Sequence, residues 1–103
     1  MKYTPHNWVV VTVPEGHKLI GGWSGGYLDG DSWRINSGIS RVEDMEDHYL
    51  VHGVSGSLYH CHKGGEEIRM NLMAPLERIK RAGFNVVEMG SILGEYTRRE
   101  DDE

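Results

Sequence analysis

The sequence predicts an α+β protein in which an antiparallel β-meander or partial barrel of about six short strands precedes one helix and a further strand. Short β-rich runs separated by turn residues fill the region before Lys63, at spacings of about 8 to 12 residues, as in antiparallel sheets. Apolar residues then recur at helical spacing from Glu66 onwards. The length of 103 residues suits one domain with one core.

The first two predicted strands form a hairpin. Residues 8–13 are β-rich and end at Pro14-Glu15-Gly16, and residues 18–23 form the second run. Five glycines then lie between Gly21 and Gly30, a density that favours turns, bulges and close backbone approaches over a long regular element. The pair Asp29-Gly30 is a strong hairpin-turn signal.

Four more strands follow from alternating polar and apolar residues around short turns. The turns are Ser37-Gly38 and Ser55-Gly56, and an acidic loop, EDMED, lies between them. The predicted strands are residues 32–36, 39–43, 48–52 and 57–62.

A helix is predicted over residues 66–82, because apolar residues recur with period 3.6 and Gly83 suits the position after its end. Pro75 lies inside this range, so a kink or a break is expected there. The alternative is a seventh strand at residues 68–72, followed by a helix that begins at Pro75. Residues 84–89 then read as a strand and 91–96 as a short closing element. The predicted domain is 1–97, with a disordered acidic tail at 98–103.

The net charge of −5 is located mainly at the end of the chain. The last four of the 16 acids are residues 100–103, which leaves 12 acids against 11 Lys and Arg, a formal charge of −1. No basic face indicates nucleic-acid binding. No apolar run reaches the roughly 18 residues of a membrane span, and the start lacks the apolar region of a signal peptide. With a single cysteine, Cys61, the expected location is the cytoplasm.

Four of the six histidines lie in one predicted hairpin, HYLVHGVSGSLYHCH. Whether they share a face depends on the register, because side chains alternate along a strand. In an even-sum register, the numbers of paired residues add to an even value, and all four histidines gather on one face. A three- or five-residue loop with a bulge, which Gly53 and Gly56 permit, would give this register. Imidazoles on adjacent strands could then converge on Zn²⁺ or a similar transition metal. The candidate metal ligands are His48, His52, His60 and His62.

The odd-sum register has a different consequence, because it places Cys61 opposite His48. A cysteine beside a histidine can become a nucleophilic thiolate. The competing interpretation is that Cys61 is a small buried hydrophobic residue. No third, orienting residue is recognisable, so no catalytic residue is assigned and an enzyme is not expected.

The run YLDGDSWRINSGISRVE followed by SGSLYHCHK, together with its surroundings over about residues 20–65, resembles small accessory proteins encoded by phages and prophages. The resemblance names no activity. It implies a compact cytosolic protein that binds and blocks a host protein, for example a defence complex of the CRISPR type.

The leading hypothesis is therefore a small non-enzymatic protein-binding module, with a host or phage protein as its partner and no cofactor. Aromatic side chains on a sheet face make good interface anchors, although at least two of the four candidates should be buried. An acidic loop can steer a basic partner. An exposed sheet edge could also pair with a second copy of the chain. The candidate binding residues are Trp23, Tyr27, Trp33, Tyr49, Glu43, Asp44, Glu46 and Asp47.

Overall fold

The computed structural model describes residues 1–25 and 31–97, and its strands form two four-stranded sheets. Sheet A has the strand order β1-β7-β6-β5, and sheet B has the order β4-β3-β2-β8. The strands are β1 (Lys2–Tyr3), β2 (Asn7–Val13), β3 (Gly16–Ser24), β4 (Asp31–Ile35), β5 (Ile39–Asp44), β6 (His48–Gly53), β7 (Leu58–His62) and β8 (Val86–Val87). The helices are the 3₁₀ turns η1 (Lys63–Gly65) and η2 (Met70–Leu72) and the α-helices α2 (Met73–Arg81) and α3 (Met89–Tyr96).

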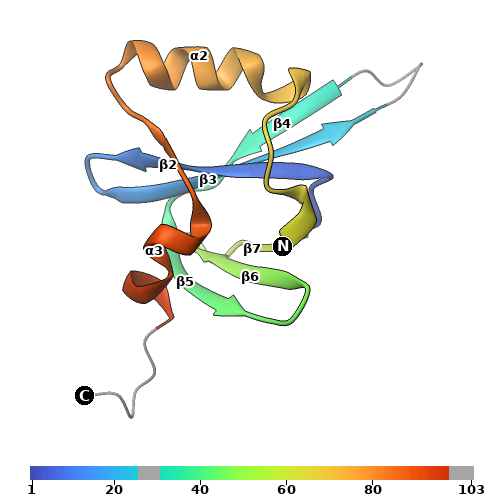
Figure 1. Ribbon diagram of the computed structural model, residues 1–103, viewed down its shortest axis with the longest axis vertical. Coiled ribbons are helices and arrows are strands. Elements are labelled where there is room, and N and C mark those ends of the chain that lie inside the picture. The colour runs from blue at the N-terminus through green and yellow to red at the C-terminus, as the bar shows by residue number, and fades with distance from the viewer. Residues whose placement is uncertain (26–30, 98–103) are drawn as a thin grey trace.

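The elements form three layers, with sheet B between α2 on one side and sheet A on the other (Figure 1). Alternation along β2 produces this arrangement, because successive side chains point to opposite faces of a sheet. Trp8 and Val10 face sheet A and pack with Tyr49, Val51 and other buried residues. The side chains on the opposite face, Val9, Val11 and Ile20, pack against Leu72 and Leu76 of η2 and α2. Both faces of β2 are therefore buried.

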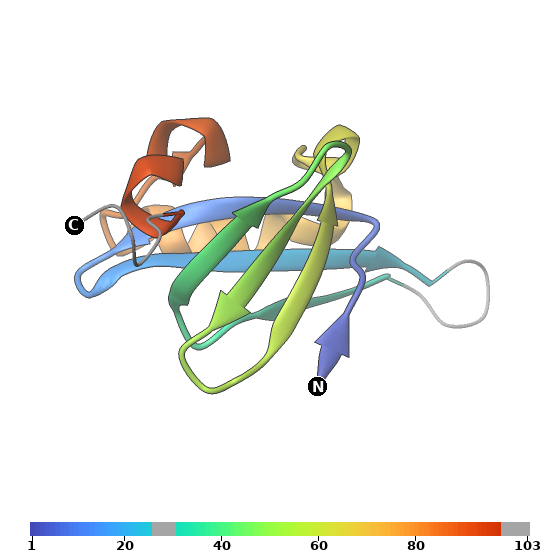
Figure 2. The ribbon, with the colours of Figure 1, turned by 90° about the horizontal axis from the view of Figure 1, so that it is seen from below.

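The helix α3 packs against β5 at the side of the sandwich (Figure 2). Its residues Met89 and Ile92 are buried in the core between the sheets. The start of α3 is held by Glu66, whose carboxylate Oε2 accepts a hydrogen bond from the backbone N–H of Met89 at 2.7 Å. A carboxylate is well placed there, because the first N–H groups of a helix have no partner within the helix.

The structure confirms the α+β class and the predicted β2–β3 and β6–β7 hairpins, whereas β4 and β5, which flank the Ser37-Gly38 turn, belong to different sheets. The turn at Pro14-Glu15 joins β2 to β3 with Val13 opposite Gly16. The strands expected from residue 31 to residue 62 are present within two residues of their predicted bounds. The meander is nevertheless divided between two sheets, and β1, which pairs in parallel with β7, was not predicted. The Asp29-Gly30 turn and the 98–103 tail lie outside the described residues.

The prediction of one helix over residues 66–82 is wrong at its start. The segment before η2 is extended, since Glu66 forms a parallel β-bridge with Trp8 and the Glu67 N–H donates to the Trp8 carbonyl. The edge of β2 thereby gains a partner that a helix could not supply. Pro75 is the third residue of α2, where its missing N–H removes no intrahelical bond, so it causes no kink. The helix ends as expected, with Gly83 at a φ of 90°.

The first glycines of the glycine-rich segment belong to the second strand, which was predicted over residues 18–23. The strand β3 continues through Gly21 and Gly22 to Ser24, and these glycines permit close approaches. A Cβ on Gly22 would lie 2.6 Å from the amide nitrogen of Asn71. The amide of Asn71 in turn exchanges two hydrogen bonds with the amide of Asn7, of 3.0 and 2.7 Å. This buried amide pair links the start of β2 to η2.

Candidate functional site

The four candidate histidines share the outer face of sheet A. The register pairs His48 with His62, Leu50 with His60 and His52 with Leu58, an even sum throughout. The three-residue loop 54–56 produces this register, because Gly53 and Ser57 pair across it and Gly56 has a φ of 96°. Tyr49 and Cys61 consequently point to the core.

Three of these histidines contact one another. The rings of His48 and His60 are stacked with centroids 4.0 Å apart, and those of His60 and His62 meet edge to face at 5.0 Å. The Nδ1 atom of His60 is buried with no hydrogen-bond partner among the described residues. Burial of its ring, followed by the positive potential of His48, His62 and Lys2, lowers the pKa of His60.

The fourth histidine is separated from the other three. The His52 Nε2 atom lies 2.7 Å from Glu43 on the neighbouring strand, and Arg41 lies 3.5 Å from the same carboxylate. This bond lowers the pKa of Glu43. Within residues 1–25 and 31–97, no three His, Cys, Asp or Glu side chains are grouped so that they could hold a metal ion. The shared face therefore does not by itself create a metal site in this arrangement.

The free energy of unfolding is expected to decrease between pH 7.5 and pH 5.5, and to decrease less in the variant His60→Gln. The pKa of His60 is lower in the folded state than its ordinary value of about 6.5, so the unfolded chain binds more protons in this range. The contribution of His60 to the free energy of unfolding must then increase as the pH rises through the ordinary pKa of histidine. Urea unfolding at several pH values measures the slope. An identical slope in wild type and His60→Gln would contradict this account.

The only cysteine is part of the core. Cys61 is fully buried opposite Tyr49, and burial raises the pKa of its thiol. It faces away from His48, which belongs to the outer face of the same hairpin. The nucleophilic pair that an odd register would create is therefore absent.

We expect Cys61 to resist a thiol reagent in the native protein. A buried thiol with a raised pKa offers neither access nor thiolate. With 5,5′-dithiobis(2-nitrobenzoate) at pH 8, the native protein should react only as fast as it unfolds. The same protein denatured in about 6 M guanidinium chloride should react at once. Rapid stoichiometric reaction of the native protein would show that Cys61 is exposed.

The aromatic candidates are divided between core and surface. Tyr49 is buried and packs edge to face against Trp8 with ring centroids 5.8 Å apart, so it is not an interface anchor. Trp23 is partly buried and donates its indole N–H to the Thr4 carbonyl. Trp33 on β4 is 39% exposed and is the accessible one of the three. Tyr27 lies outside the described residues.

The acidic loop is largely engaged in local ion pairs. Asp44 lies 2.7 Å from the Lys63 ammonium, and Asp47 contacts His48, which lowers the pKa of Asp47. Glu43 is the partner of His52 described above. Glu46 is exposed and has no ion-pair partner in the described part of the chain. Of the four predicted acids, Glu46 is therefore the one without a side-chain partner among the described residues.

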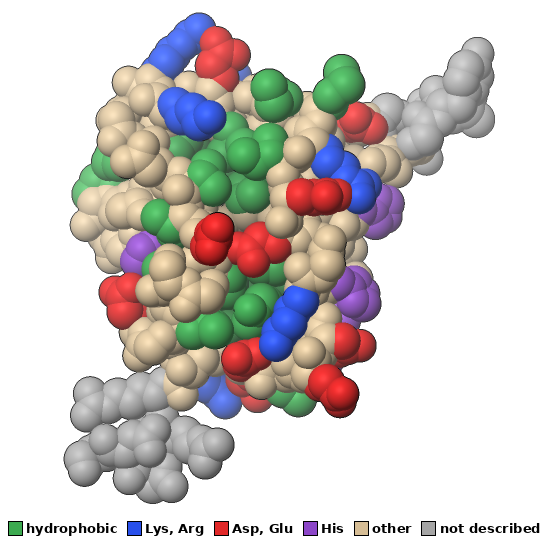
Figure 3. Space-filling view, viewed as in Figure 1, with side chains coloured by type: hydrophobic (Ala, Val, Ile, Leu, Met, Phe, Trp, Pro, Cys, Tyr) green, Lys and Arg blue, Asp and Glu red, His purple; other side chains and the backbone are tan. Residues whose placement is uncertain are grey.

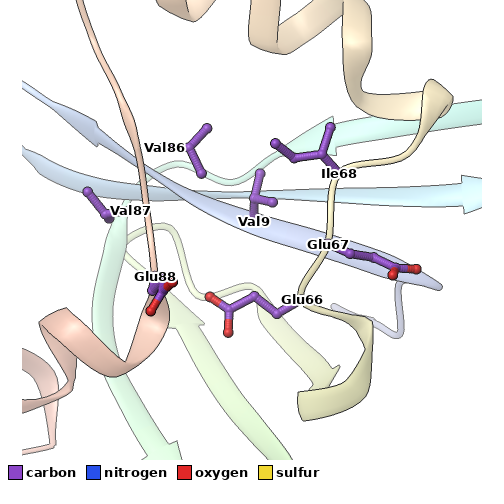
Figure 4. A pocket seen from close by; sticks show the side chains of 7 residues that line it. All are labelled: Val9, Glu66, Glu67, Ile68, Val86, Val87 and Glu88. Carbon is purple, nitrogen blue, oxygen red and sulfur yellow. The ribbon is translucent and has the colours of Figure 1, made fainter.

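A cavity of about 330 Å³ lies on another face, where no candidate was predicted. Two segments, 66–68 and 86–88, run along the same edge of β2 and leave a gap between them (Figure 4). Hydrophobic side chains line one part of this gap and carboxylates border the other, and we call it the acid-rimmed pocket. Its lining residues are Val9, Glu66, Glu67, Ile68, Val86, Val87 and Glu88.

The sequence did contain a signal for this pocket. Pro75 favours a helix that begins near it, and this leaves Glu66-Glu67-Ile68 outside the helix as a free acidic and apolar run. The predicted helix over residues 66–82 included this run, so the pocket was not predicted. The space-filling view shows acidic side chains at the centre of this face, with hydrophobic side chains above and below them (Figure 3).

Comparisons with protein-family models, with curated proteins and with solved structures found no match. Inference about function therefore rests on the geometry of the chain itself. Neither α-helix among the described residues has the length and the apolar run needed to cross a bilayer.

Proposed function

We propose that the protein is a small non-enzymatic binding module that recognises another protein. The observation that carries this proposal is a run of three large apolar side chains left in solvent, the first of which, Ile68, also lines the acid-rimmed pocket. Ile68 is 47% exposed, Met70 86% and Met73 59%, all within six residues of chain. We call these three residues the apolar strip. Exposed methionines are common on surfaces that bind other proteins, because the flexible side chain adapts to its partner.

Other surface features support recognition of a protein. Trp33 adds an exposed aromatic side chain on β4, a strand at the edge of sheet B. Glu46 adds an exposed negative charge on the acidic loop. The narrower proposal, inhibition of a host defence complex by a phage-type protein in the cytoplasm, rests on the resemblance of residues 20–65 alone.

Affinity isolation from cells that carry the gene naturally tests the general proposal. Tagged wild type is expected to retain a stoichiometric protein partner, and a variant with Met70→Ser and Met73→Ser is expected to lose it. Both methionines are exposed, so their replacement should leave the fold intact. Circular dichroism of the variant checks the fold. Recovery of no stoichiometric partner by the wild type, after cross-linking as well, would contradict the proposal.

A second candidate function is transition-metal binding by His48, His60 and His62. The observation that favours it is the even-sum register, which brings these imidazoles together on adjacent strands. The rings would have to leave their stack to direct nitrogen atoms at one ion. Untagged protein should then contain metal by elemental analysis and melt at a higher temperature with added Zn²⁺, and His60→Gln should lose the shift. Absence of both effects in the wild type eliminates this candidate.

A further inference from the structure

We propose that the acid-rimmed pocket binds an extended segment of a partner protein in which an apolar side chain lies two residues from a Lys or Arg. This inference rests on the proposed function and names the site and the chemistry of the partner. One part of the pocket accepts the apolar side chain, and the other accepts the cation.

The apolar part is lined by four aliphatic residues, Val9, Ile68, Val86 and Val87. Val9 forms the floor, while Ile68 and Val86 rise on either side of it (Figure 4). The cavity of about 330 Å³ is at the lower end of the range for ligand sites, which is roughly 300–1,000 Å³. It has room for one or two side chains of a partner.

The acidic part is formed by two carboxylates that converge. Glu66 and Glu88 extend toward each other from opposite sides of the gap, whereas Glu67 points away and pairs with Arg69 (Figure 4). One oxygen of Glu66 accepts the Met89 N–H, which leaves the other oxygen for a ligand. Neither converging carboxylate has a Lys, Arg or His ion-pair partner within residues 1–25 and 31–97. An ammonium or guanidinium group complements the two charges.

The surroundings favour a polypeptide over a small cation. The pocket shares Ile68 with the apolar strip, and a small cation would leave this exposed apolar side chain uncovered. In an extended segment, alternate side chains point the same way about 7 Å apart, which suits two adjacent parts of one pocket. The strand β8 is also the outer strand of sheet B, and such an edge can accept an extended partner. The carboxylates would repel nucleic acid.

The inference is tested by selecting peptides that bind the immobilised full chain from a library of random 12-residue peptides. A peptide of this length is roughly 40 Å long when extended. Peptides with an apolar residue two positions from Lys or Arg are expected to be enriched. Synthetic copies, measured by fluorescence anisotropy, should bind Glu88→Lys about tenfold or more weakly than wild type. The matched control is Glu15→Lys, the same change at an exposed acid in the turn between β2 and β3, which should leave affinity within about twofold.

Three outcomes overturn the inference. The first is selection of no such peptide. The second is equal binding of the selected peptides to wild type and Glu88→Lys, which places recognition on another face and leaves the proposed function standing. The third is binding of spermidine or argininamide alone as tightly as the peptide, which makes the site one for small cations. Failure of the affinity isolation from cells, by contrast, counts against the proposed function itself.

Discussion

Replacing Trp8 by alanine is expected to lower the free energy of unfolding by about 4 kcal/mol. Trp8 is fully buried between the two sheets, and its indole N–H donates to the His62 carbonyl at 2.8 Å. Its ring also packs edge to face on Tyr49. The truncation removes a large apolar surface, leaves a cavity and takes away a hydrogen bond that joins sheet B to sheet A. Because domains of this size are stable by only about 5–15 kcal/mol, much of that stability would be lost.

Urea unfolding followed by circular dichroism measures this change, and Trp33→Ala is the matched control. Trp33 is 39% exposed at the edge of sheet B, so its truncation should cost less than about 1.5 kcal/mol. Equal losses in the two variants would mean that Trp8 is not the residue that joins the sheets.

The second large loss of stability is expected from Gly22→Ala, which adds a single methyl group. We expect this variant to lower the free energy of unfolding by about 3 kcal/mol. The added methyl group would lie 2.6–2.9 Å from three atoms of the Asn71 side-chain amide. That amide cannot move freely, because it is paired with Asn7, which also donates to the Glu67 carbonyl. Relief of the clash would break buried hydrogen bonds, and retention of the bonds would strain β3. Thermal and urea unfolding both measure the loss.

Two comparisons isolate the cause. Gly94→Ala lies in α3 with nothing within 4 Å of the added carbon, so it should be neutral or stabilise by up to about 1 kcal/mol. Combining Gly22→Ala with Asn71→Ala removes the obstructing amide. The double variant should therefore lose less stability than the sum of the two single variants. Additive losses would show that the Gly22 methyl group does not meet Asn71.

The hairpins could be predicted from the sequence because their turns carry local signals. Gly16 and Gly56 each adopt a positive φ that few other residues tolerate, and each ends the predicted turn of a hairpin. Gly38 also has a positive φ, but its turn joins β4 to β5, which lie in different sheets. The division into two sheets could not be predicted, because alternation shows which side chains share a face but not which faces meet. The extended segment at Glu66 was missed for a related reason. Its conformation depends on a bridge to Trp8, a residue distant in the sequence.

The candidate sites were predictable to different degrees. For the histidine face, the sequence left one question open, which is whether the numbers of paired residues add to an even value. All four histidines lie in one hairpin, and Gly56 favours the bulged turn that gives an even value. The burial of Cys61 then follows from this register, whereas the contact of His52 with Glu43 depends on the separate pairing of β5 with β6. For the acid-rimmed pocket the sequence held a signal only for the free 66–68 segment. The pocket itself could not be predicted, because it is built from β2 and from two segments that the chain brings back much later. Only the folded edge of β2 places Val9 between Glu66 and Glu88.

The position of the pocket has a kinetic consequence. Strands β5, β6 and β7 are consecutive hairpins and can form through local contacts, whereas the amide pair of Asn7 and Asn71 joins residues 64 apart in the sequence. The edge of β2 is completed only when the 66–68 and 86–88 segments return to it, a late step because long loops close at an entropic cost. The pocket is therefore expected to assemble near the end of folding. A partner of the proposed kind would then strengthen contacts absent from the transition state, so it would slow unfolding without accelerating folding.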